Sequence, residues 1–392
     1  MSSAINRRNW LKRSALLTGG MAVLPNLFSS LKAAPRNIFN PTVNGWDERF
    51  LSDDQEHFET TPAEIKSRLC FNENPFGPSE KAKKAIVAAI DKSYQYPWKA
   101  EAEMADKIAS FENISPKNIL MDAGSSPLLL AAAESFGKGV IVSANPTYED
   151  LLKHAESLGT KVMRVPLTAD YKFDLDAIEA AVDDSVSLVY ICNPNNPTGT
   201  VLDSAKLKAF CERVSQKTMV FVDEAYMDLV DNPAATTMIP LVKAGKNIIV
   251  ARTFSKLYGM AGLRFGYVVA LPETIATLSK HTKAGQSIAA TTWAAAIASY
   301  QDKEFMKYSY DKIQESKQML YGILKKNGYD YVPTSTNFMV FPVKKESAQF
   351  ATDMSNYGVA VRSWRFAKKE WCRVSIGTAE EIRIFGEALA KV

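Results

Sequence analysis

Helical patterns and short apolar runs alternate along the chain from about residue 79 onward. Apolar residues recur at helical spacing and predict helices at 80–93, 101–111 and 127–135. Runs rich in β-branched residues predict strands at 140–142, 162–165, 186–192, 219–222, 248–251 and 265–269. This alternation predicts an α/β fold in which helices cover a mostly parallel sheet.

The pattern changes after residue 285. A long helical stretch runs to Lys326, and a terminal helix follows strand-like runs at 338–341, 359–361 and 371–376. These elements predict a smaller α+β domain, and no low-complexity linker separates it from the rest. We therefore expect two closely packed domains with a ligand in the cleft between them. The expected division is a signal segment at 1–34, an arm joining the small domain at 35–78, a large domain at 79–285 and a small domain at 286–392.

The first 34 residues run in the order basic, apolar, small. Arg7 and Arg8 precede an apolar run at 15–24, which is too short to span a bilayer. This order is typical of an export signal, and the paired arginines resemble the twin-arginine (Tat) class. We expect Tat-dependent export to the periplasm, with membrane anchoring if the segment is not cleaved. The alternatives are a basic helix packed on the protein and a cytoplasmic location.

Composition excludes several classes of function. The formal charge is +4, but the five basic residues of segment 1–34 exceed this surplus, so the remaining chain indicates neither a nucleic acid nor a membrane surface as a partner. The four cysteines form no C-x-x-C pair and are predicted to be small buried residues. The three histidines have no metal-binding spacing, so we expect no metal.

Charged residues at predicted strand ends supply candidate chemistry. The run 219–222 ends in Asp223, and the run 248–251 leads to Lys256. Because ligands of open α/β sheets collect at the carboxyl ends of strands, both residues could meet one cofactor. Several short motifs accompany them: Asn72-Glu73-Asn74-Pro75, Tyr96-Pro97, Asn145-Pro146-Thr147-Tyr148, Asn193-Pro194-Asn195-Asn196-Pro197-Thr198-Gly199 and Ala261-Gly262-Leu263-Arg264.

These ordered motifs resemble the pyridoxal 5'-phosphate (PLP) aminotransferases of fold type I, class I/II, and most closely the histidinol-phosphate aminotransferase family. The resemblance runs from about Leu69 to Thr378 and implies a mostly parallel sheet of the seven-stranded type. It implies that Lys256 forms a Schiff base with PLP and then transfers protons. Asp223 would hold the proton of the pyridine nitrogen. The implied reaction is a ping-pong cycle between an amino donor and a keto acid acceptor.

The resemblance also assigns the surroundings of the cofactor. Asn196 and Tyr226 would contact its phenolic oxygen, and Tyr148 would lie against the ring. A helix predicted to begin near Pro127 would direct backbone N–H groups at the phosphate. The residues implied to contact the phosphate are Ser125, Ser126, Ser255 and Arg264.

Further residues are implied to bind the substrate or a second subunit. Tyr96 would reach the phosphate of the neighbouring subunit, which implies a homodimer. Arg373 would grip the anionic group of the substrate, since a guanidinium pairs well with a carboxylate or phosphate. Arg362 and Asn74 are weaker candidates for substrate contacts.

Two departures from the family pattern leave the substrate open. Biosynthetic histidinol-phosphate aminotransferases usually have Gly-Ser-Asp-Glu where this chain has Gly124-Ser125-Ser126-Pro127, and Trp98 replaces an Asp after the Tyr-Pro pair. A decarboxylase, carbon–sulfur lyase or racemase on the same fold is an alternative, because each begins with the same covalent cofactor adduct. A non-catalytic PLP-binding sensor is a remote alternative, since residues 1–60 show no helix-turn-helix pattern.

Overall fold

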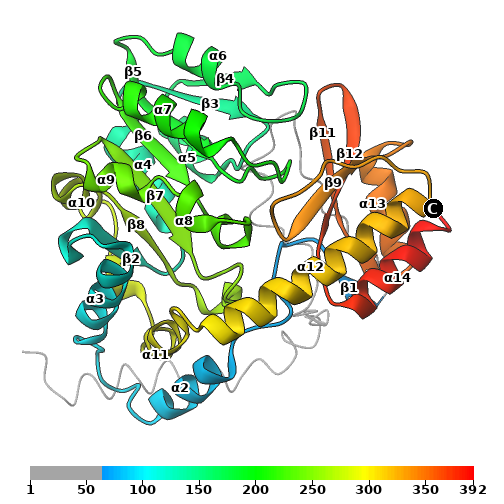
Figure 1. Cartoon of the computed structure of the whole chain (residues 1–392), viewed down its shortest axis with the longest axis horizontal. Helices are drawn as coiled ribbons and strands as arrows, with labels where there is room; N and C mark the ends of the chain where they lie inside the picture. The colour runs from blue at the N-terminus through cyan, green and yellow to red at the C-terminus, as the bar shows by residue number, and fades with distance from the viewer. Residues whose placement is uncertain (1–63) are drawn as a thin grey trace, which may run out of the picture. The chain divides into compact units, whose positions relative to one another are not determined.

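A seven-stranded sheet is the largest element of the computed structural model, which describes residues 64–392 (Figure 1). Its strands are, in spatial order, β2 (Ile119–Asp122), β8 (Gly266–Val269), β7 (Ile248–Thr253), β6 (Met219–Asp223), β5 (Val186–Cys192), β3 (Val140–Asn145) and β4 (Val162–Pro166). β8 runs antiparallel to both of its neighbours, and the other pairs are parallel. The predicted mostly parallel sheet is therefore confirmed.

Helices connect the strands and cover the sheet (Figure 1). They are α3 (Ala100–Glu112), α4 (Ser126–Phe136), α5 (Asp150–Ser157), α6 (Leu175–Ala180), α7 (Ser204–Val214), α8 (Pro233–Thr236), α9 (Ile239–Lys243), α10 (Pro272–Leu278) and α11 (Ala290–Ser299). α2 (Glu80–Ile90) packs instead on α11. The central strands β5, β6 and β7 are almost entirely buried. Burial on both faces explains why these strands appear in the sequence as continuous apolar runs.

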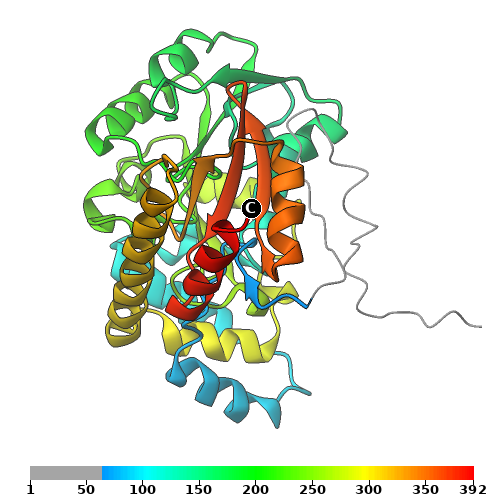
Figure 2. The same cartoon turned by 90° about the vertical axis from the view of Figure 1, so that its right-hand side faces the viewer.

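The C-terminal part of the chain builds two smaller sheets. The first is antiparallel, in the order β11 (Arg362–Phe366), β12 (Lys369–Ser375) and β9 (Phe338–Pro342). In the second, β1 (Ser67–Arg68) pairs in parallel with β10 (Val359–Ala360). Figure 2 shows β11 and β12 between two helices, α12 (Lys303–Lys326) and α13 (Ser347–Asn356). The last helix, α14 (Ala379–Leu389), packs on α12.

Several elements differ from the sequence-based expectation, and three of them show why. β2 was not predicted, because its Ile-Leu-Met run lacks the density of β-branched residues that indicates a strand. The helical stretch expected up to Lys326 is two helices, separated where Gln301 adopts a positive φ of 61°. β11 was also not predicted, because two arginines interrupt its aromatic residues.

None of the described helices is both long and apolar enough to cross a membrane. The expected signal segment, 1–34, lies outside the described residues.

A buried ion pair joins the ends of β6 and β7. Arg252 donates from Nε to Glu224 Oε2 at 2.9 Å and from Nη1 to Asp228 Oδ1 at 3.3 Å. Glu224 also accepts hydrogen bonds from the Thr237 hydroxyl and the Met238 N–H. Removing one partner of such a pair leaves a buried charge without compensation.

Replacing Arg252 with alanine should therefore lower the free energy of unfolding by about 3–5 kcal/mol. Arg213→Ala is the matched control, because its ion pair with Glu179 is largely exposed and screened by solvent, so its loss should change the stability much less. Urea unfolding followed by circular dichroism measures both losses. Equal losses in the two variants would contradict the importance assigned to the buried pair.

Candidate functional site

Three neighbouring parallel strands, β5, β6 and β7, end at one edge of the large sheet. Asp223 is the last residue of β6, Asn196 follows β5, and Lys256 follows β7. Ligands of open α/β sheets bind at such edges. The fold therefore places these three candidates where a ligand would be expected.

Asp223 is fully buried, and both of its carboxylate oxygens accept hydrogen bonds. The Ala225 N–H donates to Oδ1 at 3.1 Å, and the Tyr190 hydroxyl donates to Oδ2 at 3.2 Å. Burial raises the pKa of Asp223 to about 6, and both donors oppose that rise. The carboxylate is therefore largely ionised at neutral pH although it lies in the interior.

Lys256 carries a partly buried amine. Its Nζ donates to the backbone oxygen of Asn72 at 3.2 Å and lies 5.2 Å from the centre of the Tyr226 ring. Burial, followed by the positive charge of Arg373, lowers the pKa of Lys256 to about 8. The neutral amine, which is the nucleophile, is therefore far more populated near physiological pH than in an ordinary lysine, and it predominates above about pH 8.

The side chains of Tyr226 and Asn196 each keep a donor group available for a ligand. The Asn72 amide donates to the Tyr226 hydroxyl at 3.1 Å, so the hydroxyl proton of Tyr226 remains free to be donated elsewhere. Arg373 donates from Nη1 to Asn196 Oδ1 at 2.7 Å, which orients the Asn196 amide with its N–H₂ group pointing away from the arginine.

The N-terminus of α4 forms a candidate anion site. Ser125 caps this helix without a side-chain hydrogen bond, Pro127 has no N–H, and the Leu128 N–H donates to the Ser125 carbonyl, so the Ser126 N–H is the backbone donor of the first turn that remains for an anion. Gly124 has a φ of 93°, and a Cβ on it would lie 2.3 Å from the Arg264 guanidinium, so only glycine allows the arginine this close. Arg264 also donates to the Ser255 hydroxyl at 3.5 Å.

Tyr148 is linked to this helix through a carboxylate. Its hydroxyl donates to Asp150 Oδ2 at 2.5 Å, and the Ser126 hydroxyl donates to the same oxygen at 3.2 Å. Burial, with a contribution from Asp150, raises the pKa of Tyr148 well above its ordinary value. The phenol therefore stays protonated and fixed beside the anion site.

Arg373 and Arg362 lie side by side because they share an acceptor. The backbone oxygen of Cys70 accepts from Arg373 Nη2 at 3.1 Å and from Arg362 Nε at 3.2 Å. Arg373 is only 4% exposed, whereas Arg362 is partly exposed and lies 5.3 Å from the Phe71 ring. The two guanidinium groups thus lie together, with Arg373 the one that contacts Asn196.

Two of the predicted site residues are not joined to this group of side chains within one chain. Asn74 donates to the Leu257 backbone oxygen at 2.7 Å and to the Ser309 hydroxyl at 2.6 Å, so it holds the turn after Lys256. Tyr96 is 78% exposed and packs against Trp98 with ring centres 5.4 Å apart. Within the described chain, Tyr96 forms no hydrogen bond with the other candidates.

Three residues at this site were absent from the sequence-based assignment: Asn72, Asp150 and Tyr190. The Asn-Glu-Asn-Pro motif pointed to the right segment, but the asparagine that contacts Lys256 and Tyr226 is the first one. Tyr190 lies in an apolar strand, where a tyrosine is usually part of the core. No sequence signal distinguished Asp150 from an ordinary helix N-terminal acid.

All four cysteines are buried and unpaired, as predicted. Within residues 64–392, no group of three histidine, cysteine, aspartate or glutamate side chains is placed to hold a metal ion.

Comparison with known proteins identifies the family. The model of the family "Aminotransferase class I and II" matches residues 64–389. The chain belongs to this family. It is thus an aminotransferase with the fold type I architecture, and the candidate site lies entirely within the matched region.

Individual members of the family are similar over most of their length. The histidinol-phosphate aminotransferase of Moorella thermoacetica is 34% identical, covering 83% of this chain and 85% of that protein. The aromatic amino acid aminotransferase of Mycolicibacterium vanbaalenii is 36% identical, covering 82% and 91%. The structure of the histidinol-phosphate aminotransferase from Sinorhizobium meliloti, in complex with pyridoxal-5'-phosphate, has a TM-score of 0.77 at 28% identity, covering 84% and 91%.

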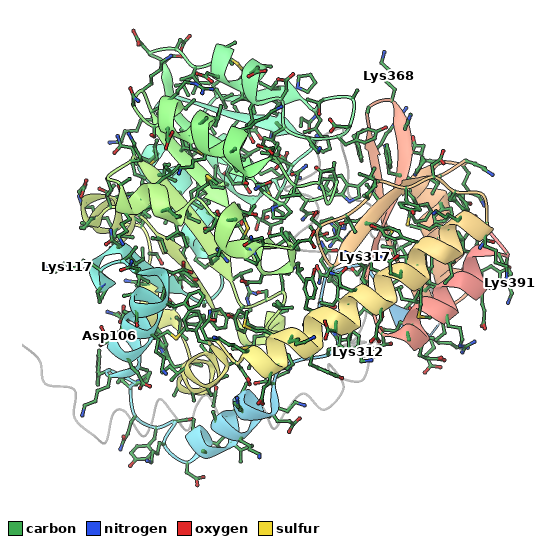
Figure 3. The ribbon with its side chains drawn as sticks, in the orientation of Figure 1. Asp106, Lys117, Lys312, Lys317, Lys368 and Lys391 are labelled. Carbon is green, nitrogen blue, oxygen red and sulfur yellow. The ribbon has the colours of Figure 1, made fainter. Side chains whose placement is uncertain are left out.

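The lowered pKa of Lys256 in this aminotransferase predicts unusual reactivity. In the cofactor-free protein, the rate of acetylation of Lys256 should level off above about pH 8, where the amine is neutral. Lys312 on α12 is the internal control, because its ion pair with Glu315 raises its pKa and its reactivity should keep rising at higher pH (Figure 3). Competitive labelling with peptide mass spectrometry measures both residues, and parallel pH profiles would contradict the prediction.

Proposed function

We propose that this chain is a PLP-dependent aminotransferase that transfers an amino group from an anionic amino acid or amine to a keto acid. The proposal rests on one observation: an amine with a lowered pKa, a buried carboxylate and an anion site lie together at one sheet edge. Lys256, Asp223 and the N-terminus of α4 supply these groups. Aminotransferases of class I and II use PLP, which carries an aldehyde, a pyridine nitrogen and a phosphate.

The donor set fits this cofactor group by group. Lys256 Nζ would hold the aldehyde carbon, and the Asp223 carboxylate would accept the proton of the pyridine nitrogen. The phosphate would accept from the Ser126 N–H at the start of α4. The side chains that would bind the phosphate alongside it are Ser125, Ser126, Ser255 and Arg264. Gly124 supports this assignment, since a side chain there would displace the arginine.

The remaining donors suit the phenolic oxygen and the ring. The Tyr226 hydroxyl accepts from Asn72 and can donate its own proton, while Asn196 can donate from its amide. Both groups would stabilise a negative oxygen. Tyr148 would lie against the ring face, with its hydroxyl fixed by Asp150.

When bound, PLP supplies an electron sink for the electrons of a bond at the substrate Cα. The protein then has to move a proton, and Lys256 is the group placed to do so. Its amine is largely neutral above about pH 8 and therefore able to accept a proton from Cα. Asp223, ionised above about pH 6, would keep the pyridine nitrogen protonated.

The proposed substrate class rests on Arg373 and Arg362, which share the Cys70 carbonyl. Arg373 also donates to Asn196. Paired guanidinium groups favour a carboxylate or phosphate on the donor. Relatives are named for histidinol phosphate, which carries a phosphate, and for aromatic amino acids, which carry a carboxylate. A decarboxylase, lyase or racemase would share the early steps, but the curated relatives cited above are named aminotransferases.

We also propose that the chain acts as a homodimer. Tyr96 and Trp98 are 78% and 75% exposed, and large exposed aromatic side chains mark interaction surfaces. In this arrangement Tyr96 would reach the phosphate site of the neighbouring subunit.

Absorption spectroscopy of the purified full-length protein tests the proposed reaction. The wild type should be yellow, lose its colour with one amino donor and regain it with a keto acid. Borohydride should fix the cofactor on Lys256, so Lys256→Ala should lose the reducible adduct and at least about 10³-fold in activity. Lys317→Ala, which removes another half-buried lysine, is the matched control and should keep both (Figure 3). A Lys256→Ala protein that still forms the adduct would refute the assignment, and release of carbon dioxide without colour loss would indicate a decarboxylase.

Export through the Tat machinery to the periplasm is a further proposal, supported by Arg7 and Arg8 and the apolar run that follows. Replacing both arginines with lysine should abolish export and leave the protein in the cytoplasmic fraction. Arg13→Lys preserves the pair and should be exported normally. Cell fractionation with immunoblotting provides the measurement, and normal export of the double variant would rule out the Tat route.

A further inference from the structure

The register of β5 and β6 places a tyrosine next to Asp223. Tyr190 is opposite Phe221 and Cys192 is opposite Asp223, so all four side chains project from the same face of these paired strands. Tyr190 is fully buried, and its ring packs 5.8 Å from the Phe221 ring. This packing fixes the hydroxyl 3.2 Å from Asp223 Oδ2.

We propose that Tyr190 is a positioning residue for the reaction, whose hydroxyl holds Asp223 in place and in its ionised form. This inference rests on the proposed function, in which the Asp223 carboxylate pairs with the pyridine nitrogen. The Ala225 N–H occupies Oδ1, so Tyr190 is the side-chain donor that holds the other oxygen. A fixed carboxylate meets the ring nitrogen without reorganisation.

The ionisation of Asp223 is a balance between opposed groups. Burial raises its pKa most strongly, and the charge of Asp150 raises it further. The Ala225 N–H, the Tyr190 hydroxyl and the charge of Lys256 lower it. The other titratable groups facing Asp223 are Cys192 on β5 and Tyr226 after β6, both kept protonated at neutral pH by burial.

Tyr190 itself does not titrate in the working range. Burial raises the pKa of Tyr190 well above its ordinary value, so the phenol remains a donor. Removing the hydroxyl should therefore shift the protonation midpoint of Asp223 upward, because the ionised form loses a hydrogen bond. The expected shift is about one pH unit, which corresponds to an about tenfold change in the protonation equilibrium.

Tyr190→Phe is the test variant, because it deletes a single oxygen and keeps the ring. Tyr267→Phe is the matched control: Tyr267 is also a buried tyrosine of the sheet, on β8, but its hydroxyl is near Tyr300 rather than Asp223. Asp150→Asn should shift the protonation midpoint of Asp223 in the opposite direction, because it removes the charge that disfavours ionised Asp223. The variant keeps an oxygen that can accept from Tyr148.

The measurement is the affinity of the cofactor-free protein for PLP between pH 5 and 8, together with the pH profile of kcat/KM. The midpoint of the acid-side loss should move up by about one pH unit in Tyr190→Phe, move down in Asp150→Asn and stay unchanged in Tyr267→Phe. A purely structural role would lower the urea midpoint of Tyr190→Phe without moving the pH midpoint.

Each outcome decides a separate point. If the wild type binds PLP and transaminates while Tyr190→Phe keeps the wild-type pH midpoint, the role of Tyr190 is refuted and the proposed function stands. If Tyr190→Phe does not fold, an unchanged midpoint in Asp150→Asn overturns the charge balance on which the inference depends. If the wild type neither binds PLP nor transaminates, the proposed function itself fails.

Discussion

The burial of Asp223 and the partial burial of Lys256 at adjacent strand ends are the constraint on which the site depends. Burial alone would push both residues toward their neutral forms. Hydrogen bonds to Asp223 limit this effect, so it remains an anion at neutral pH. Lys256 has one backbone acceptor, and a neighbouring cation lowers its pKa further. The same environment thus prepares one group as a charge and the other as a nucleophile.

The parallel sheet makes this arrangement possible. Strands β5, β6 and β7 run in the same direction, so residues that follow each of them collect at one edge. Arg252, buried against Glu224, ties the same strand ends together one residue beyond Asp223. This buried ion pair therefore lies directly behind the site, where it helps to keep the backbone that carries Asp223 rigid.

Much of this could be predicted from the sequence, because the decisive residues lie in local motifs at strand ends. Asp223, Lys256 and Asn196 are examples, and continuous runs of β-branched and apolar residues predicted most of the large sheet. The residues that were missed act through contacts distant in sequence. Asn72 lies 154 residues from Tyr226, and Tyr190 lies 33 residues from Asp223. Their roles depend on register and packing, which single-residue patterns do not encode.

The segment that includes Cys70 and Asn72 has a consequence for the integrity of the molecule. Through two backbone carbonyls it contacts Arg362, Arg373 and Lys256, which come from elements more than 180 residues away. The segment anchors both groups at once, because the residues proposed for substrate recognition and for proton transfer are hydrogen-bonded to the same few peptide groups. A single proteolytic cut there would loosen the anchoring of the two arginines and of Lys256 together. Truncation from the N-terminus is therefore tolerated only up to the start of this segment.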